Sequence, residues 1–169
     1  MAILATISGA ISMFVMFLGY IVKKRTSYLT AQMIANFFYG LQFMLLGGYS
    51  AGCAALVGIG KNIWFYYYEK KNLKPSIIAL VVLESIYITI GVLTFDGLVS
   101  LIPIFLSCTY AWAGWQTNLQ ITRIVGFLAS ILWVFYDIQV GAYISIFASA
   151  IEALACTIGF IKKARAKDN

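Results

Sequence analysis

The sequence predicts an all-α membrane protein whose chain crosses the lipid bilayer seven times. Hydrophobic residues make up 62% of the chain and charged residues only 11%, with a mean hydropathy of +0.90. A soluble domain is about half apolar and about a quarter charged, so a soluble core could not absorb this much apolar surface. Apolar runs separated by short polar segments account for nearly the whole chain.

The predicted spans follow one another with short connections. They are Ile3–Val22, Tyr28–Leu46, Ala51–Tyr68, Ser76–Leu93, Leu98–Ala113, Ile121–Tyr136 and Val140–Ile161. Pro75 directly precedes the fourth span, where a proline suits the first turn of a helix. Pro103 lies inside the fifth span, where it permits a kink or hinge.

The positive charges predict the orientation of the chain. The 12 Lys and Arg residues give a net charge of +6, and all except Lys61 lie at the ends of apolar runs or in the tail. With the N-terminus outside, these charges fall in cytoplasmic connections, while the outer loops hold only Asp96 and Asp137. The pattern therefore indicates a membrane topology rather than nucleic-acid binding, with a basic cytoplasmic tail near anionic lipid headgroups. Because the charges follow the first span, it is expected to be a retained helix rather than a cleaved signal peptide.

The hydropathy pattern repeats when the chain is shifted by 91 residues. At this shift the spans of residues 1–70 coincide with those of residues 96–169, and Lys61 meets Glu152. Residues 71–95 then form a linker helix that crosses once, so both triplets of helices point the same way. This predicts a three-plus-one-plus-three arrangement of parallel repeats, a plan in which transporters place the substrate site near the midplane between repeats.

Three charged side chains, Lys61, Glu84 and Glu152, fall within the predicted spans. Each costs about 2.5–3.5 kcal/mol at the centre of a membrane helix, so each is expected to face a partner or a water-filled cavity. One interpretation makes Lys61 and Glu152 a structural ion pair. A second makes them a charged substrate site or a proton-linked switch, and in a third Glu84 competes with Glu152 for Lys61.

Two faces of small or polar residues accompany these charges. The second span carries Gln32, Asn36 and Gly40 on one face, which fits amide hydrogen bonds between helices. The face around Glu152 is otherwise made of small residues, namely Ser145, Ala148, Ser149, Ala155, Cys156 and Gly159. Small residues there allow close helix packing, form the wall of a cavity, or do both.

The candidate binding site is the midplane region between the two triplets. The residues expected to contact a substrate are Lys61, Asn62, Glu152, Asn36 and Trp133. The residues expected to act in coupling or gating are Glu84 and Pro103. A site with both signs of charge suits a zwitterionic or carboxylate-bearing solute better than a neutral sugar.

The composition argues against several classes of chemistry. The chain has no histidine, which removes Ser-His catalysis and most zinc sites, and its three cysteines fall in different spans. No metal or cofactor is therefore expected. Glu84 and Glu152 could in principle do acid–base work, but nothing positions a nucleophile, so an enzyme is not expected.

The stretch GLQFMLLGGYSAGCAAL at residues 40–56, followed by Lys61, resembles part of the YgjV family of bacterial inner-membrane proteins. The second half, from Leu101 through Trp133 to the closing lysines, is similar as well. This resemblance implies a place in the bacterial inner membrane and leaves the substrate open. The helix plan also looks like that of the SWEET sugar and PnuC vitamin transporters, a likeness of fold rather than of function. The Pro-Gln signature of the SWEET relatives is missing, because Ile104 follows Pro103.

These observations favour a small transporter of a polar or charged metabolite, with its site between the repeats. The expected partners are the solute, membrane lipids and further copies of the chain, but no nucleic acid. The alternative is a non-transporting structural or accessory membrane protein that contains a structural intramembrane ion pair.

Overall fold

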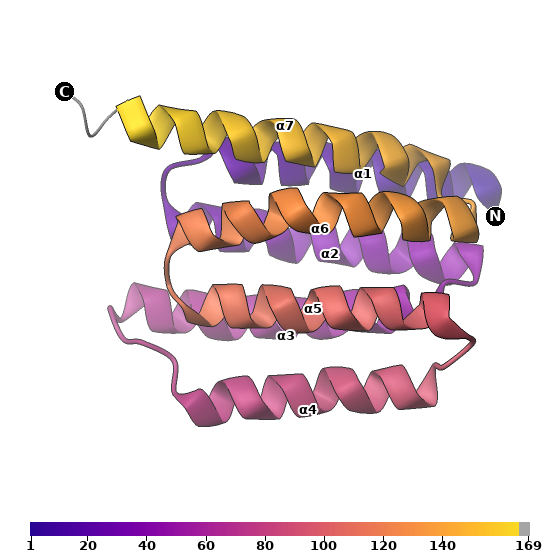
Figure 1. Cartoon of the computed structure of the whole chain (residues 1–169), viewed down its shortest axis with the longest axis horizontal. Coiled ribbons are helices and arrows are strands. Elements are labelled where there is room, and N and C mark those ends of the chain that lie inside the picture. The colour runs from indigo at the N-terminus through magenta and orange to yellow at the C-terminus, as the bar shows by residue number, and fades with distance from the viewer. Residues whose placement is uncertain (166–169) are drawn as a thin grey trace.

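Helices make up almost all of the computed structural model, which describes residues 1–165 and the side chains of residues 1–158 (Figure 1). Within this part of the chain the α-helices are α1 (Ala2–Ile21), α2 (Arg25–Leu46), α3 (Tyr49–Lys70), α4 (Ile77–Leu93), α5 (Leu101–Trp115), α6 (Leu119–Val140) and α7 (Tyr143–Arg165). A single 3-10 turn, η1 (Leu98–Ser100), precedes α5. The prediction of an all-α chain with seven helices is confirmed for these residues. Gly159, predicted on the face of Glu152, and the basic tail lie outside residues 1–158, whose side chains are described.

The helices form two layers of three, with α4 at one edge (Figure 1). In one layer α2 packs between α1 and α3, and in the other α6 packs between α5 and α7. The layers are joined at their edges, where α1 packs against α7 and α3 against α5. The six helices therefore form a closed ring, and α4 packs outside it against α5 and α3.

Four helical segments of the described chain are long and apolar enough to cross a membrane. They are α1, α2, the segment Leu98–Trp115 and α6, whose mean hydropathies lie between 1.3 and 2.1. The shorter helix α4 and the described part of α7 are also apolar. At about 1.5 Å of rise per residue, 20 residues match the roughly 30 Å hydrocarbon layer.

Two glycines end the central helix of each layer in the same way. Gly47 follows α2 with φ 82°, and Gly141 follows α6 with φ 73°. This left-handed conformation suits glycine because it has no side chain to collide with the backbone. Each glycine reverses the chain so that the next helix begins two residues later, at Tyr49 and Tyr143.

The expected loop around Asp137 is wrong. The helix α6 continues to Val140 and ends only at Gly141, so Asp137 lies in its last turn and is 1% exposed. The side chain therefore belongs to the interior of the bundle. The next helix correspondingly begins at Tyr143 rather than at Val140.

Several helix bounds correspond at a shift of 94 residues rather than at the predicted 91. The bounds of α2 and α6 differ by 94 residues at both ends (119 − 25 and 140 − 46). The starts of α3 and α7 differ by the same 94 residues (143 − 49), as do the ends of α1 and α5 (115 − 21). Lys61 and Glu152 are therefore not equivalent positions, because Glu152 lies three residues nearer the start of its helix.

Pro103 lies in the first turn of α5 and is buried. A proline at this position costs no internal hydrogen bond, since the first N–H groups of a helix have no partner within it. The 3-10 turn at Leu98–Ser100 occupies the start of the predicted span, so α5 begins only two residues before Pro103.

Candidate functional site

A cavity of about 90 Å³ lies between the helices of the ring. Since a water molecule needs roughly 10–15 Å³ by this measure, the cavity has room for several waters or a small solute. Its polar lining consists of Gln32, Asn36, Lys61, Ser107, Asp137, Ser145, Ser149 and Glu152. Its aromatic lining consists of Tyr39, Phe43, Tyr87, Tyr110 and Trp133. Both layers of helices thus contribute to one site.

Glu152 of α7 is held by two tyrosine hydroxyl groups. Tyr20 of α1 donates to its Oε1 at 2.5 Å, and Tyr110 of α5 donates to the same oxygen at 2.8 Å. Gly126 of α6 leaves the space for this arrangement, since a Cβ there would lie 3.0 Å from the Tyr20 hydroxyl and 3.2 Å from Oε1. The carboxyl group therefore links both layers at the cavity.

Lys61 of α3 lines the same cavity and is 5% exposed, but it does not form the predicted ion pair with Glu152. Among the described residues the ion pair found within 4 Å joins Arg25 and Glu69. Glu84 of α4 acts electrostatically on Lys61, as the competing interpretation expected. The two charges fail to meet because Glu152 lies about one helical turn from the depth of Lys61 and is bound by the tyrosines.

Asp137 is the acidic residue of the cavity that the sequence did not indicate. It lines the cavity, and its Oδ1 is buried without a hydrogen-bond partner among the described residues. Ser149 of α7 interacts with the same carboxyl group, and Glu152 acts on it electrostatically. The cavity therefore contains two acidic groups that are near enough to influence each other.

The remaining predicted residues divide between the cavity and its surroundings. Asn36 and Trp133 line the cavity. A Cβ on Gly58 would lie only 2.5 Å from the Asn36 amide nitrogen, so the lack of a side chain at Gly58 leaves room for that amide. Asn62 does not line the cavity; it is fully buried, and both of its amide atoms lack a hydrogen-bond partner among the described residues. Glu84 and Pro103 also lie outside the cavity lining.

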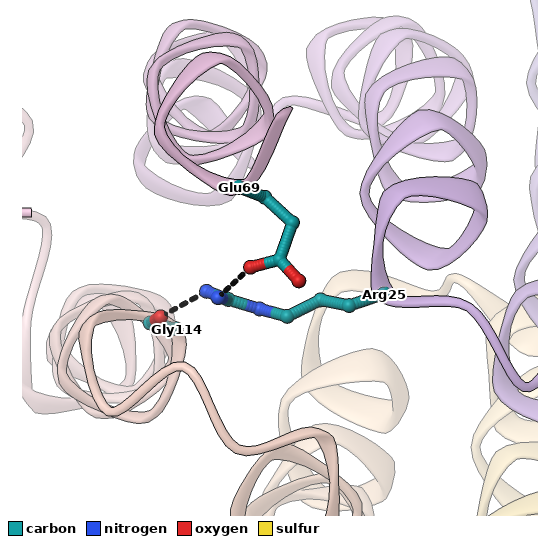
Figure 2. A network of polar contacts seen from close by, with 3 residues as sticks. All are labelled: Arg25, Glu69 and Gly114. Carbon is teal, nitrogen blue, oxygen red and sulfur yellow. Dashed lines mark hydrogen bonds and ion pairs between the residues drawn. The ribbon is translucent and has the colours of Figure 1, made fainter. Parts of the chain in front are cut away.

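The end of the bundle that holds Arg25 and Arg123 is called the arginine end here. Figure 2 shows Arg25 at the start of α2 reaching between two other helices. It donates to Oε2 of Glu69 at 2.5 Å and to the carbonyl oxygen of Gly114 in α5. Arg123 of α6 donates to the carbonyl oxygens of Tyr20 and Val22, at 3.1 and 3.0 Å. Arginines of each layer thus bind the end of a helix in the other layer.

The opposite end, called the aromatic end, contains stacked rings. Phe43 of α2 stacks with Trp133 of α6 at a centroid distance of 5.9 Å and with Tyr39 at 6.0 Å. Tyr136 contacts Phe43 edge-on at 5.7 Å. The central helices of the two layers therefore meet through aromatic rings at this end.

Comparison with known proteins identifies a family. Residues 3–167 match the model of the Imp-YgjV family, described as a bacterial inner membrane protein. No curated protein and no solved structure matches the chain. The match spans nearly the whole chain, and it confirms both the predicted family and the predicted location in the bacterial inner membrane.

Proposed function

The chain belongs to this family of bacterial inner membrane proteins, and we propose that it is a small transporter of a polar or charged metabolite. Its site would be the cavity between the two layers of helices. The observation that carries this proposal is that both layers supply polar side chains to one cavity inside an otherwise apolar bundle. Buried polar and charged groups are costly in a membrane and mark solute pathways.

The two layers fit a pair of parallel repeats related by 94 residues. Besides the matching helix ends, the carbonyl groups that accept from the two arginines correspond, because Tyr20 and Gly114 are 94 residues apart (114 − 20). The arginines themselves, Arg123 and Arg25, are 98 residues apart (123 − 25). The domain plan proposed from the sequence, 1–70, 71–95 and 96–169, follows from this. Parallel repeats of this kind recur in transporters, with the site at their interface.

The proposed topology has seven crossings, with the N-terminus outside and the C-terminus in the cytoplasm. The connections α1–α2, α3–α4 and α5–α6 lie at the arginine end (Figure 1). Five lysines lie in or directly beside these connections, namely Lys23, Lys24, Lys70, Lys71 and Lys74. The opposite connections contain Asp96 and no Lys or Arg. Cytoplasmic connections carry an excess of Lys and Arg, which makes the arginine end the cytoplasmic one.

The test is uptake by liposomes that contain the purified protein. Labelled choline, glycine and succinate represent cationic, zwitterionic and anionic solutes. We expect saturable uptake of one of these classes, and Glu152→Gln should lower its initial rate at least about tenfold. A hydrogen bond to a charged group contributes about 1.5–3 kcal/mol, and about 1.4 kcal/mol corresponds to a factor of ten.

The matched control is Asp96→Asn, which makes the same acid-to-amide change on an exposed loop. It should leave uptake unchanged. Wild-type uptake equal to that of empty liposomes, for all three solutes, would support the non-transporting alternative. Normal uptake by the Glu152→Gln variant would show that transport does not use this cavity.

A further inference from the structure

We propose that the cavity binds a small organic ammonium ion between Asp137 and Glu152, against the aromatic rings of Tyr39, Phe43 and Trp133. This inference rests on the proposed function, because it names the class of solute for the same site. It also departs from the zwitterionic or carboxylate-bearing solute that the sequence favoured. The reason is the second acid, Asp137, which the sequence placed in a loop.

Asp137 supplies the first part of the argument. Its side chain is 1% exposed, lines the cavity, and leaves Oδ1 without a hydrogen-bond partner among the described residues. A buried carboxyl oxygen without a partner is costly, whereas a bound N–H donor or cation would satisfy it. A positively charged ligand would therefore supply the partner that Oδ1 of Asp137 lacks.

The distribution of charge along the cavity supplies the second part. Counted from the aromatic end, Asp137 is three residues from the end of α6, Glu152 nine from the start of α7, and Lys61 twelve from the start of α3. At 1.5 Å per residue, the two acids lie about 9 Å apart along the bundle, and Lys61 lies about 13 Å from Asp137. Glu84 also acts on Lys61 from outside the cavity lining. By the same count Lys61 lies about 4.5 Å from the depth of Glu152, so Asp137 is the charged residue of the cavity lining that is farther from Lys61.

The aromatic rings supply the third part. Tyr39, Phe43 and Trp133 line the cavity and stack on one another with interplanar angles of 15–18°. Aromatic faces attract cations, and ammonium groups with alkyl substituents also gain from contact with the ring surface. The described residues contain no group of three or more His, Cys, Asp or Glu side chains that could hold a metal ion. The combination therefore fits an organic cation better than a metal ion.

The experiment compares choline with 3,3-dimethylbutan-1-ol, which replaces the charged nitrogen of choline by carbon and keeps its shape. Binding of each is measured by titration calorimetry on the full chain in lipid nanodiscs. We expect choline to bind at least tenfold more tightly than the alcohol. Asp137→Asn should weaken choline binding at least tenfold, and Asp96→Asn, the same change on an exposed loop, should leave it unchanged.

Equal binding of the two compounds, or no binding of choline, would overturn the inference. If Asp137→Asn does not fold, Trp133→Leu provides the second variant and should weaken choline binding at least fivefold while leaving the binding of the alcohol nearly unchanged. Similar losses for both compounds, or none for either, would overturn the inference.

Flux measurements separate this inference from the proposed function. Choline that binds without crossing the liposome membrane would reject transport and keep the ammonium site. Uptake of glycine or succinate by protein that does not bind choline would reject the ammonium site and keep transport.

Discussion

Different kinds of interaction join the two layers at the two ends of the bundle. At the arginine end, Arg25 and Arg123 make charged hydrogen bonds between the layers. At the aromatic end, Phe43 and Trp133 stack across the layers. Charged groups can exchange these bonds for bonds to water, whereas stacked rings lose contact area when they separate. Separation of the layers would therefore cost exchanged hydrogen bonds at the arginine end and lost ring contact at the aromatic end.

The cations of the arginine end bind the ends of helices in the opposite layer. The helices α1 and α5 both end there, and the last carbonyl groups of a helix have no partner within it. Arg25 binds the carbonyl of Gly114 in α5, and Arg123 binds those of Tyr20 and Val22 at the end of α1. A positive charge at this end of a helix also interacts favourably with its dipole.

Removal of the central ring should have the largest effect on stability. Phe43 is 3% exposed and contacts three other aromatic rings. Phe43→Ala should lower the free energy of unfolding by about 3–5 kcal/mol, because it removes a buried aromatic side chain and leaves a cavity. The measurement is unfolding in detergent micelles, followed by circular dichroism.

The control for this prediction is Phe147→Ala on α7. Phe147 is 65% exposed in the bundle, so the same truncation should cost less than about 0.5 kcal/mol. A loss of stability in Phe147→Ala equal to that in Phe43→Ala would contradict the view that ring stacking joins the two layers at the aromatic end.

Loss of the arginine contacts should have a smaller effect. Arg25→Ala removes the bonds to Glu69 and Gly114 and should cost about 1.5–3 kcal/mol, the range for hydrogen bonds to charged groups. The cost stays moderate because Glu69 is 32% exposed, so water can replace the arginine there. The same unfolding measurement applies, with Lys24→Ala as the control because Lys24 is the exposed neighbouring cation. If Arg25→Ala destabilised the protein more than Phe43→Ala, the proposed difference between the ends would be reversed.

The sequence predicted the helices well, since each apolar run is flanked by charges, glycine or proline. It missed the role of Arg25 and Arg123, because a cation after an apolar run looks the same whether it faces water or binds a neighbouring helix. The hydroxyl groups that hold Glu152 were missed for a similar reason. Tyr20 lies 132 residues from Glu152, and no local pattern shows that the two meet.

The error at Asp137 has a local cause. An acid close to a glycine suggests a loop, but here the glycine at position 141 marks the end of the helix and the acid lies one turn inside it. The predicted span ended at Tyr136, whereas the helix continues to Val140. This misplaced end accompanied an alignment of the two halves that was shifted by three residues, which made Lys61 and Glu152 look like equivalent positions. Alignment of Gly47 with Gly141, both followed two residues later by tyrosine, is the sequence signal for the shift of 94 at which the bounds of α2 and α6 correspond (141 − 47).

The smallest predicted effect concerns Gly58, which lies beside the cavity. Its substitution leaves the arginine contacts and the stacked rings at the two ends of the bundle unchanged. Gly58→Ala would place a Cβ 2.5 Å from the Asn36 amide nitrogen, which is the end of a flexible side chain and can move. We therefore expect a change in unfolding free energy within about 1 kcal/mol, together with choline binding that is weakened about fivefold as the amide is displaced in the cavity. Gly60→Ala is the matched control on the same helix, because a Cβ there meets nothing within 4 Å. It should stabilise α3 by about 0.5–1 kcal/mol and leave binding unchanged. Equal choline affinity in the two variants would mean that Asn36 does not contact the solute, and the site would then depend on the acids and the rings alone.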